Sequence, residues 1–264
     1  MKNLDSILQE VVSLTTTVRS FIKKESENFD KSSIEHKGFN DLVSYVDKEA
    51  EKQLVAGCKN ILPEAGFITE EGTESTRHED YNWIIDPLDG TTNFTHGLPI
   101  FAISLALMFR NQIVLGVVHE INRDECFYAI EGSEAYCNDQ VIKVSETLEL
   151  KDSLLATGFP YYNFEKMPKY LKILDSLMQS THGLRRMGSA AVDLVYVACG
   201  RFEGFFEYNL NAWDVAAGAF IVQQAGGKVT DFSGGDNFVF GREIIAAGNV
   251  HDELHTVIHN IWKE

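Results

Sequence analysis

Two aspartates three residues apart form the most informative chemical feature of the sequence. Asp86 and Asp89 lie in the segment Trp83-Ile-Ile-Asp-Pro-Leu-Asp-Gly-Thr-Thr-Asn-Phe94, where an apolar run ends. Carboxylates at this spacing on a tight turn can face a shared point, with the backbone carbonyl of Leu88 between them. Hard cations such as Mg²⁺ prefer oxygen ligands of this kind. The alternative is an acidic turn without a metal, because Asp, Pro and Gly are common turn residues.

Other acidic residues also stand where predicted elements begin or end. Glu70 and Glu71 directly follow an apolar stretch. Asp214 lies at the start of a predicted helix, where an aspartate by itself predicts an N-cap. Asp47 belongs to another predicted helix. Together with the two aspartates above, these acids favour a cation site over a simple acidic turn.

The Gly188-Ser-Ala-Ala191 segment precedes a predicted helix and offers a different chemistry. Unpaired backbone N–H groups at a helix N-terminus suit a phosphate or hydroxyl ligand. The alternative is a serine N-cap on an ordinary helix, because Ser is common at that position.

These motifs resemble the signature motifs of the inositol monophosphatase family. Five segments carry the resemblance, in the family's order and spacing over almost the whole chain: Asp41-Leu-Val-Ser-Tyr-Val-Asp47, Glu70-Glu71, Asp86-Pro-Leu-Asp-Gly-Thr-Thr-Asn-Phe94, Gly188-Ser-Ala-Ala191 and Trp213-Asp-Val-Ala-Ala-Gly218. The resemblance implies a layered αβαβα sandwich of the sugar-phosphatase type. It also implies two or three Mg²⁺ ions as cofactor, a homodimer, and inhibition by lithium.

The resemblance further implies a role for individual residues. The metal ligands would be Glu70, Asp86, the Leu88 carbonyl, Asp89 and Asp214. The catalytic residues would be Glu70, Asp47 and Thr91, the last two of which would orient the attacking water. The substrate-binding residues would be Asp89, Gly90, Thr91, Gly188, Ser189, Ala190, Glu207 and Asp214. Of these, Glu207 would accept a hydrogen bond from a substrate hydroxyl.

The implied reaction is hydrolysis of a small polyol or sugar phosphate monoester by metal-activated water, without a phosphoenzyme. Inositol 1-phosphate is the leading candidate substrate. Related phosphatases make fructose 1,6-bisphosphate, 3′-phosphoadenosine 5′-phosphate and histidinol phosphate alternative substrates. A non-catalytic binding protein is a further alternative, and some bacterial relatives are associated with the transcription machinery. Because every ligand position is filled, the sequence favours catalysis.

Two departures from the family pattern concern specificity. Asn211 stands where animal members have a His, and the Thr157-Gly-Phe-Pro-Tyr161 segment resembles bacterial members. The residue after Thr91 is a second Thr, whereas the nucleotide phosphatases usually have Lys there. These differences leave the metal ligands intact and bear on the polyol part of the substrate.

The elements that must position these residues alternate along the chain. Periodicity predicts helices over residues 4–24, 41–58 (with Asp41 as the N-cap), 168–179, 189–199, 214–225 and 251–262. It predicts strands over residues 81–86, 103–109, 113–119, 127–130, 203–207, 228–231 and 244–247, with Pro87 ending the first. This order indicates layered α+β structure with a mixed sheet in the first half. We expect two halves that pack as one unit, 1–145 with the main metal motifs and 146–264 with the substrate turn and Asp214.

Composition limits the partners that we expect. The 264 residues include 39 acidic and 23 basic side chains, for a formal net charge of -16. Such a charge repels nucleic acid and anionic membranes, so we expect no direct binding of either. It would also repel a phosphate substrate unless bound cations reverse the local sign. No apolar stretch reaches about 18 residues, no signal peptide is recognisable and the four cysteines are scattered, so we expect reduced thiols and a cytoplasmic protein.

Three other features receive structural interpretations. His251, His255 and His259 share one face of the last predicted helix and lack the sequence pattern of a zinc protease, so we expect a packing or solvated face. Asp193 is expected to be a buried, hydrogen-bonded acid with a structural role. The Arg185-Arg186 pair is expected to serve an interface or ion pairs rather than a phosphate.

Overall fold

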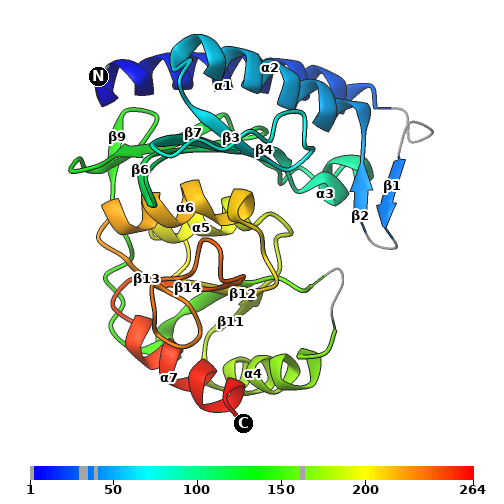
Figure 1. The fold of residues 1–264 in the computed structure, drawn as a ribbon. Helices are drawn as coiled ribbons and strands as arrows, with labels where there is room; N and C mark the ends of the chain where they lie inside the picture. The colour runs from blue at the N-terminus through cyan, green and yellow to red at the C-terminus, as the bar shows by residue number, and fades with distance from the viewer. Residues whose placement is uncertain (1–2, 30–34, 39–40, 161–163) are drawn as a thin grey trace.

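The protein is built of five alternating layers of helices and sheets, which Figure 1 shows from top to bottom. The computed structural model describes residues 3–29, 35–38, 41–160 and 164–264, with the backbone alone for 35–38 and 41–43. The outer layers are α1 (Leu4–Glu27) with α2 (Tyr45–Ile61), and α4 (Met167–Ser180) with α7 (His251–Trp262). The middle layer is α5 (Ala190–Ala198) with α6 (Ala212–Gln224), between two sheets. The predicted αβαβα sandwich is therefore confirmed.

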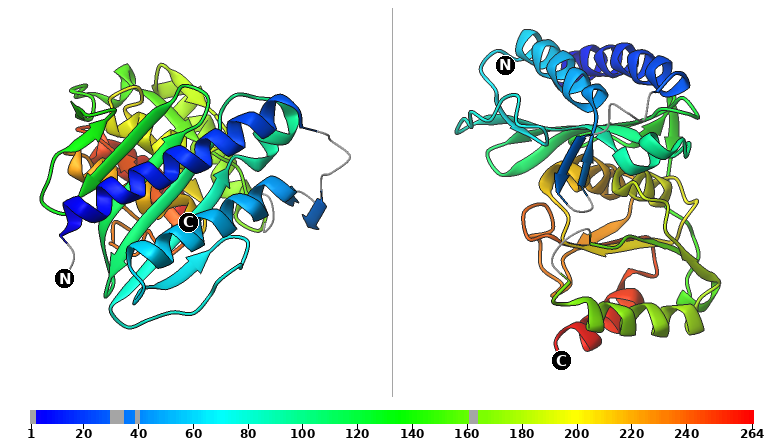
Figure 2. Two further views of the ribbon diagram at one scale, coloured as in Figure 1. Left: turned by 90° about the horizontal axis from the view of Figure 1, so that it is seen from above. Right: turned by 90° about the vertical axis from the view of Figure 1, so that its right-hand side faces the viewer.

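Helix α1 covers the outer face of the first sheet. Its buried side chains recur every three or four residues, at Ile7, Val11, Thr15, Val18 and Ile22. This period places them on one face of the helix, which packs into the core that the sheet shares with α2. The left view of Figure 2 shows α1 and α2 lying across the strands.

Helix α2 begins at Tyr45, so the prediction that it starts near Asp41 is wrong. Residues Asp41–Val43 form the short strand β2, which pairs with β1 (Glu35–Gly38). The N-cap is Ser44, and Asp47 accepts a hydrogen bond from Ser44 N at 2.8 Å. This capping box holds the Asp47 carboxylate at the start of the helix.

The first sheet has seven strands in chain order. They are β3 (Gly66–Thr69), β4 (Tyr81–Asp89), β5 (Ala102–Phe109), β6 (Gln112–Glu120), β7 (Glu125–Ile130), β8 (Ala135–Cys137) and β9 (Gln140–Ile142). Strands β3 and β4 are parallel, and each following pair is antiparallel. The predicted mixed sheet is confirmed, and the predicted strands 103–109 and 113–119 correspond to the antiparallel pair β5 and β6.

Strand β4 continues past Pro87, where the sequence predicts its end. Asp86 pairs with Ser104 and Asp89 with Ala102 on β5, so the register shifts between the two aspartates. An irregularity of this kind tolerates a proline and redirects the neighbouring side chains. The short helix α3 (Thr91–His96) follows at once.

The second sheet has five strands in the order β11-β10-β12-β14-β13. Their bounds are β10 (Leu154–Thr157), β11 (Gly183–Arg185), β12 (Gly204–Tyr208), β13 (Lys228–Thr230) and β14 (Glu243–Ala247). Strand β10 is parallel to both of its neighbours, whereas β14 is antiparallel to both of its own.

Helices α5 and α6 join the two sheets through one continuous core. Their buried side chains share a cluster with Ile84 and Val118 of the first sheet and with Phe205 and Ala246 of the second. The chain passes from one sheet to the other between β9 and β10. The division into halves at residue 145 stays a prediction.

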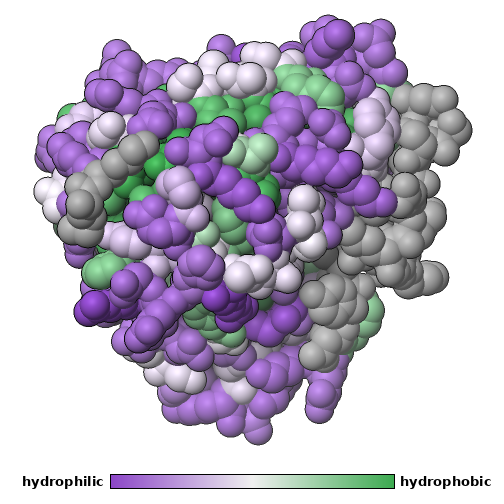
Figure 3. All heavy atoms as spheres, turned by 45° about the horizontal axis from the view of Figure 1, so that its top comes forward, coloured by the Kyte–Doolittle hydropathy of each residue, from purple (hydrophilic) through white to green (hydrophobic). Residues whose placement is uncertain are grey.

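The outer surface is mainly polar on the face drawn in Figure 3, where apolar residues form smaller patches between hydrophilic ones. None of the helices in the described ranges combines the length and apolar character that crossing a bilayer requires.

Candidate metal and substrate site

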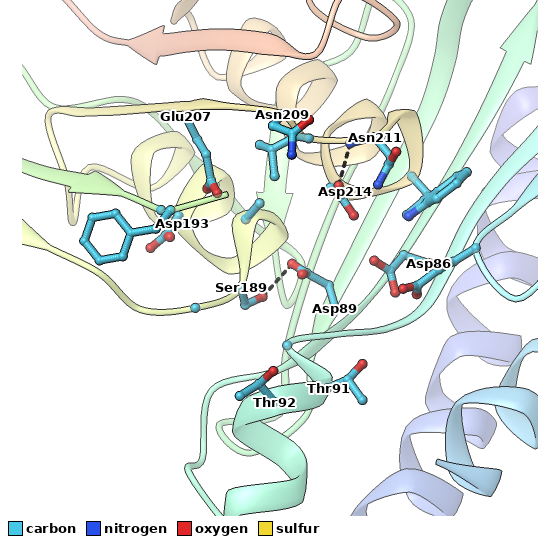
Figure 4. A pocket seen from close by; sticks show the side chains of 18 of the residues that line it. Asp86, Asp89, Thr91, Thr92, Ser189, Asp193, Glu207, Asn209, Asn211 and Asp214 are labelled. Carbon is cyan, nitrogen blue, oxygen red and sulfur yellow. Dashed lines mark hydrogen bonds between the residues drawn. The ribbon is translucent and has the colours of Figure 1, made fainter. Parts of the chain in front are cut away.

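A cavity of about 350 Å³ opens where β4, α3, α5, α6 and the loop after β10 meet. Figure 4 shows acidic side chains on several sides of it. Nearly all of the predicted site residues line this cavity: Glu70, Asp86, Leu88, Asp89, Gly90, Thr91, Gly188, Ser189, Ala190, Glu207 and Asp214. Of the predicted set, Asp47 alone is fully buried and absent from the lining.

Three carboxylates converge on one side of the cavity. One oxygen from each of Asp86, Asp89 and Asp214 lies within 4.8 Å of the other two. The irregular end of β4 supplies the first two, and the first turn of α6 supplies the third. Since α6 begins at Ala212 after the N-cap Asn211, the expectation that Asp214 itself is the N-cap is wrong.

Hydrogen bonds orient these three carboxylates. Asp86 accepts one from the backbone N of Leu88 at 2.9 Å, and Asp214 accepts one from the backbone N of Asn211 at 2.6 Å. Asp89 accepts one from the Ser189 hydroxyl at 2.7 Å and one from the backbone N of Ala191 at 2.6 Å. These bonds fix the direction of the three carboxylates, and Asp86 also interacts with the Glu70 carboxylate.

The grouping is electrostatically unfavourable without a cation. Burial, and then the charges of Glu70, Asp89 and Asp214, raise the pKa of Asp86 well above its usual value. Burial likewise raises the pKa of Asp89 to about 6 and, with the charge of Asp89, that of Asp214 to about 7. A divalent cation would let all three ionise, and carboxylate oxygens suit a hard cation such as Mg²⁺.

Glu70 and Leu88 border this group of carboxylates. Glu70 follows β3, and its backbone N donates to Ile85 O at 3.2 Å. After burial, its charge is the largest cause of the raised pKa of Asp86, although Glu70 is outside the three converging acids. The Leu88 side chain is buried, and its carbonyl oxygen lies 3.1 Å from the Thr91 hydroxyl. These residues can therefore complete a cation site around Asp86.

Thr91 connects the cavity to the buried Asp47. Its hydroxyl oxygen lies 2.8 Å from Asp47 Oδ1, while Asp47 Oδ2 accepts bonds from the backbone N and the hydroxyl of Ser44. Among the described contacts, it is Thr91 that links Asp47 to the cavity. The N-cap of α3 is Gly90 at φ 99°, a left-handed conformation that favours glycine.

The turn before α5 forms a second side of the cavity. Gly188 adopts φ 88°, and an added Cβ there would lie 2.5 Å from Arg186 Nη1. Asn93 of α3 holds this turn by donating to Met187 O at 2.8 Å. Ser189 is both the N-cap of α5 and the partner of Asp89, so the two interpretations of this serine are compatible.

The end of the cavity away from Asp86 in Figure 4 carries Glu207 and Asp193. Glu207 lies on β12 against Gly158, where an added Cβ would lie 2.0 Å from Glu207 Oε2. Burial, and then the charge of Asp214, raise the pKa of Glu207 to about 8, while the Arg186 charge opposes this rise.

Asp193 and Arg186 also line the cavity, which the sequence does not predict. Asp193 is buried, and within the described part of the chain its Oδ1 has no hydrogen-bond partner, so the expected structural hydrogen bonding is wrong for this oxygen. Asp193 lies four residues after Ser189 on α5, a spacing that places both on one helix face and could have indicated it. Phe159, Asn209, Asn211 and Trp213 also line the cavity.

The three histidines of α7 pack away from the cavity. His251 contacts the Thr230 hydroxyl at 3.0 Å, and His259 contacts Phe232 O at 3.1 Å. The ring of His255 stacks between the other two, with centroids 6.1 and 5.3 Å apart. Among the described residues, Asp86, Asp89 and Asp214 form the one cluster of Asp, Glu, His or Cys side chains whose geometry suits a metal ion.

Comparison with known proteins identifies relatives of this chain. The family model described as "Inositol monophosphatase family" matches residues 3–263. A putative Nus factor SuhB of Neisseria meningitidis serogroup B is 46% identical over 221 residues, which are 83% of this chain and 85% of that protein. An inositol-1-monophosphatase of Mesorhizobium japonicum is 40% identical over 215 residues, 81% of each chain.

A solved structure agrees with this assignment. The inositol monophosphatase from Anabaena superposes with a TM-score of 0.87 at 32% identity, covering 98% of this chain and 97% of that one. The match of the family model over almost the entire length agrees with the five layers and with the acidic cavity between them. The chain belongs to the inositol monophosphatase family.

Proposed function

We propose that this protein is a Mg²⁺-dependent phosphatase that hydrolyses the phosphate monoester of a small polyol, with inositol 1-phosphate as the leading candidate. The observation that carries the proposal is the convergence of Asp86, Asp89 and Asp214 beside a cavity that also exposes Thr91 and Glu207. A cation site, a residue that can hold water and a residue that can bind a hydroxyl thus share one space.

The acids would hold two or three cations through Glu70, Asp86, the Leu88 carbonyl, Asp89 and Asp214. When bound, such cations supply a water of lowered pKa and a positive charge for the departing oxygen. The cluster of carboxylates would otherwise repel a phosphate dianion. Binding cations first therefore explains how a chain of net charge -16 can accept a phosphate ester.

The side chains of Thr91 and Asp47 can position the attacking water directly. When the Thr91 hydroxyl donates to Asp47 Oδ1, its oxygen can still accept a hydrogen bond from a water in the cavity. The buried Asp47 fixes the orientation of this hydroxyl. The described lining contains no Cys or His that could serve as a nucleophile, and the Ser189 hydroxyl is engaged with Asp89. These contacts support direct attack by water.

The end of the cavity that carries Glu207 favours hydroxyl groups over a second phosphate. When ionised, Glu207 can accept a hydrogen bond from a hydroxyl and would repel an additional phosphate. Bound cations favour the ionised form because they offset the Asp214 charge, which after burial raises the pKa of Glu207. This supports polyol monophosphates over fructose 1,6-bisphosphate or 3′-phosphoadenosine 5′-phosphate. The homodimer and the lithium inhibition remain predictions.

The test is a panel of phosphate esters assayed for phosphate release with Mg²⁺. The panel contains inositol 1-phosphate, fructose 1,6-bisphosphate, 3′-phosphoadenosine 5′-phosphate, histidinol phosphate and p-nitrophenyl phosphate. We expect the highest kcat/KM for inositol 1-phosphate. A higher value for a bisphosphate would reject the polyol assignment, and no release from any ester would reject the enzyme.

The names of several relatives suggest a second candidate, a role as a Nus factor. We propose this role only in addition to catalysis, because a protein used solely for binding has no need of the full set of acids. The Asp214→Asn variant separates the two roles. Cells that carry only this variant should lose the phosphatase activity, and normal transcription in them would show that a Nus-type role does not depend on the cavity.

A further inference from the structure

Arg186 differs in charge from every other ionisable residue of the cavity. The described lining includes six acids (Glu70, Asp86, Asp89, Asp193, Glu207 and Asp214) and a single base, Arg186. Its position is shaped by glycine, because an added Cβ at Gly188 would lie 2.5 Å from Arg186 Nη1. The backbone turn that lines the cavity therefore leaves room for this guanidinium.

The guanidinium lies at the hydroxyl-binding end of the cavity. Burial raises the pKa of Asp89, Asp193 and Glu207, and the positive charge of Arg186 opposes this rise in all three, which places it within their electrostatic reach. Its carbon lies 5.8 Å from the centroid of the Phe159 ring, which is 41% exposed at the cavity. An aromatic face of this kind supports a guanidinium plane while leaving N–H donors at its edge.

Asp193 lies within electrostatic reach of Arg186 on the cavity lining. Asp193 Oδ1 is buried and accepts no hydrogen bond from the described residues, although Arg186 is close enough to influence it electrostatically. The Arg186 side chain is exposed. A guanidinium has five N–H donors in a rigid fork, so it can bind further acceptors from a ligand.

A polyol supplies the matching chemistry. Each hydroxyl has one hydrogen to donate and an oxygen that accepts. We propose, resting on the polyol phosphatase function above, that Arg186 is a specificity-determining residue that donates hydrogen bonds to hydroxyl oxygens of the substrate while Glu207 accepts a hydrogen bond from a hydroxyl. The preferred substrate then carries neighbouring hydroxyls on the side of its ring away from the phosphate.

The neighbouring Arg185 provides a matched control. It is also exposed, but it donates to Leu184 O and does not line the cavity. The Arg186→Gln and Arg185→Gln variants lose the same charge one residue apart. A general effect of net charge on an anionic substrate would appear in both, whereas direct contact would appear only in the first.

The experiment measures KM and kcat for inositol 1-phosphate and p-nitrophenyl phosphate with Mg²⁺ in the wild type and three variants. Arg186→Gln should raise KM for inositol 1-phosphate roughly tenfold, as expected for loss of a hydrogen bond to a charged group. KM for p-nitrophenyl phosphate should change less than about twofold by the same reasoning. Arg186→Lys should be intermediate, because it keeps the charge and loses the fork. Arg185→Gln should match the wild type.

Binding of inositol gives a readout independent of turnover. Saturation-transfer NMR with inositol, Mg²⁺ and inorganic phosphate should show weaker inositol binding by Arg186→Gln than by Arg185→Gln. Equal losses on both esters, or unchanged KM and inositol binding, would overturn the assignment of Arg186. A wild type that hydrolyses p-nitrophenyl phosphate without preferring inositol 1-phosphate would overturn the polyol subsite alone. A wild type that hydrolyses neither would overturn the proposed function itself.

Discussion

Replacement of Asp214 by Asn tests whether Asp214 is a metal ligand or serves only to stabilise the start of α6. An asparagine oxygen can still accept the hydrogen bond from the backbone N of Asn211, which is 2.6 Å long in the native protein. The substitution removes a negative charge that lies within 4.8 Å of ligand oxygens of Asp86 and Asp89. We therefore expect the metal-free protein to become more stable at neutral pH and metal binding to become weaker.

The magnitude follows from the pKa of Asp214. Burial, and then the Asp89 charge, raise it from 3.8 to about 7. Between these values the folded protein holds a proton that the unfolded chain has released, so the free energy of unfolding falls as pH rises through this window. From pH 5 to the folded pKa is about two units, or about 3 kcal/mol at about 1.36 kcal/mol per unit. The Asp214→Asn variant should lack this loss.

The assay is urea unfolding in EDTA at pH 5 and pH 8. The wild type should lose stability from pH 5 to pH 8, and Asp214→Asn should lose about 3 kcal/mol less. The exposed Asp236 supplies the control, because Asp236→Asn makes the same charge change away from the cavity. Added Mg²⁺ should stabilise the wild type and the control but not Asp214→Asn. A variant that is less stable than the wild type at pH 8 in EDTA, or equally stabilised by Mg²⁺, would refute the reasoning.

Three further substitutions test other parts of the account. Thr91→Val should lower kcat roughly 10²-fold with little change in KM, because it removes the hydroxyl that links the water to Asp47; an unchanged kcat in steady-state assays would contradict that role. Glu207→Gln should raise KM for inositol 1-phosphate roughly tenfold and affect p-nitrophenyl phosphate less; equal losses would assign Glu207 to the cations or the fold. Burial lowers the pKa of His119 below 6.5, so the unfolded chain takes up a proton first and stability is lost as pH falls below that value. His119→Gln should flatten this loss in unfolding measurements between pH 7 and pH 5, about the range in which histidine titrates, and an unchanged slope would exclude His119 as its source.

The long elements were predictable because their apolar periodicity is extended. Helix α1 repeats its buried positions over about four turns, and α7 has the predicted bounds of 251–262. Strands of three residues such as β8, β9 and β11 are too short to show any period. The path through Pro87 depends on pairing with β5 across the sheet, which no local pattern reveals.

The site was predictable where its residues belong to local motifs. Asp86 and Asp89 are neighbours in sequence, so their shared direction follows from one turn. The approach of Asp214 depends on α6 packing between the sheets, and only the family resemblance indicated it before the fold was known. Arg186 lines the cavity because of the direction of the turn before α5, and Asp193 does so because of the helix face on which it lies. Residue type alone determines neither.

The most direct test of the central claim is phosphate release from inositol 1-phosphate by protein treated exhaustively with EDTA, before and after Mg²⁺ is restored. The three converging carboxylates and their raised pKa values predict that cations are required for turnover. We expect no release above background in EDTA and full recovery with Mg²⁺, with Ca²⁺ supporting little turnover because it is larger and less strict in geometry. Full activity in EDTA with no metal restored would contradict the account.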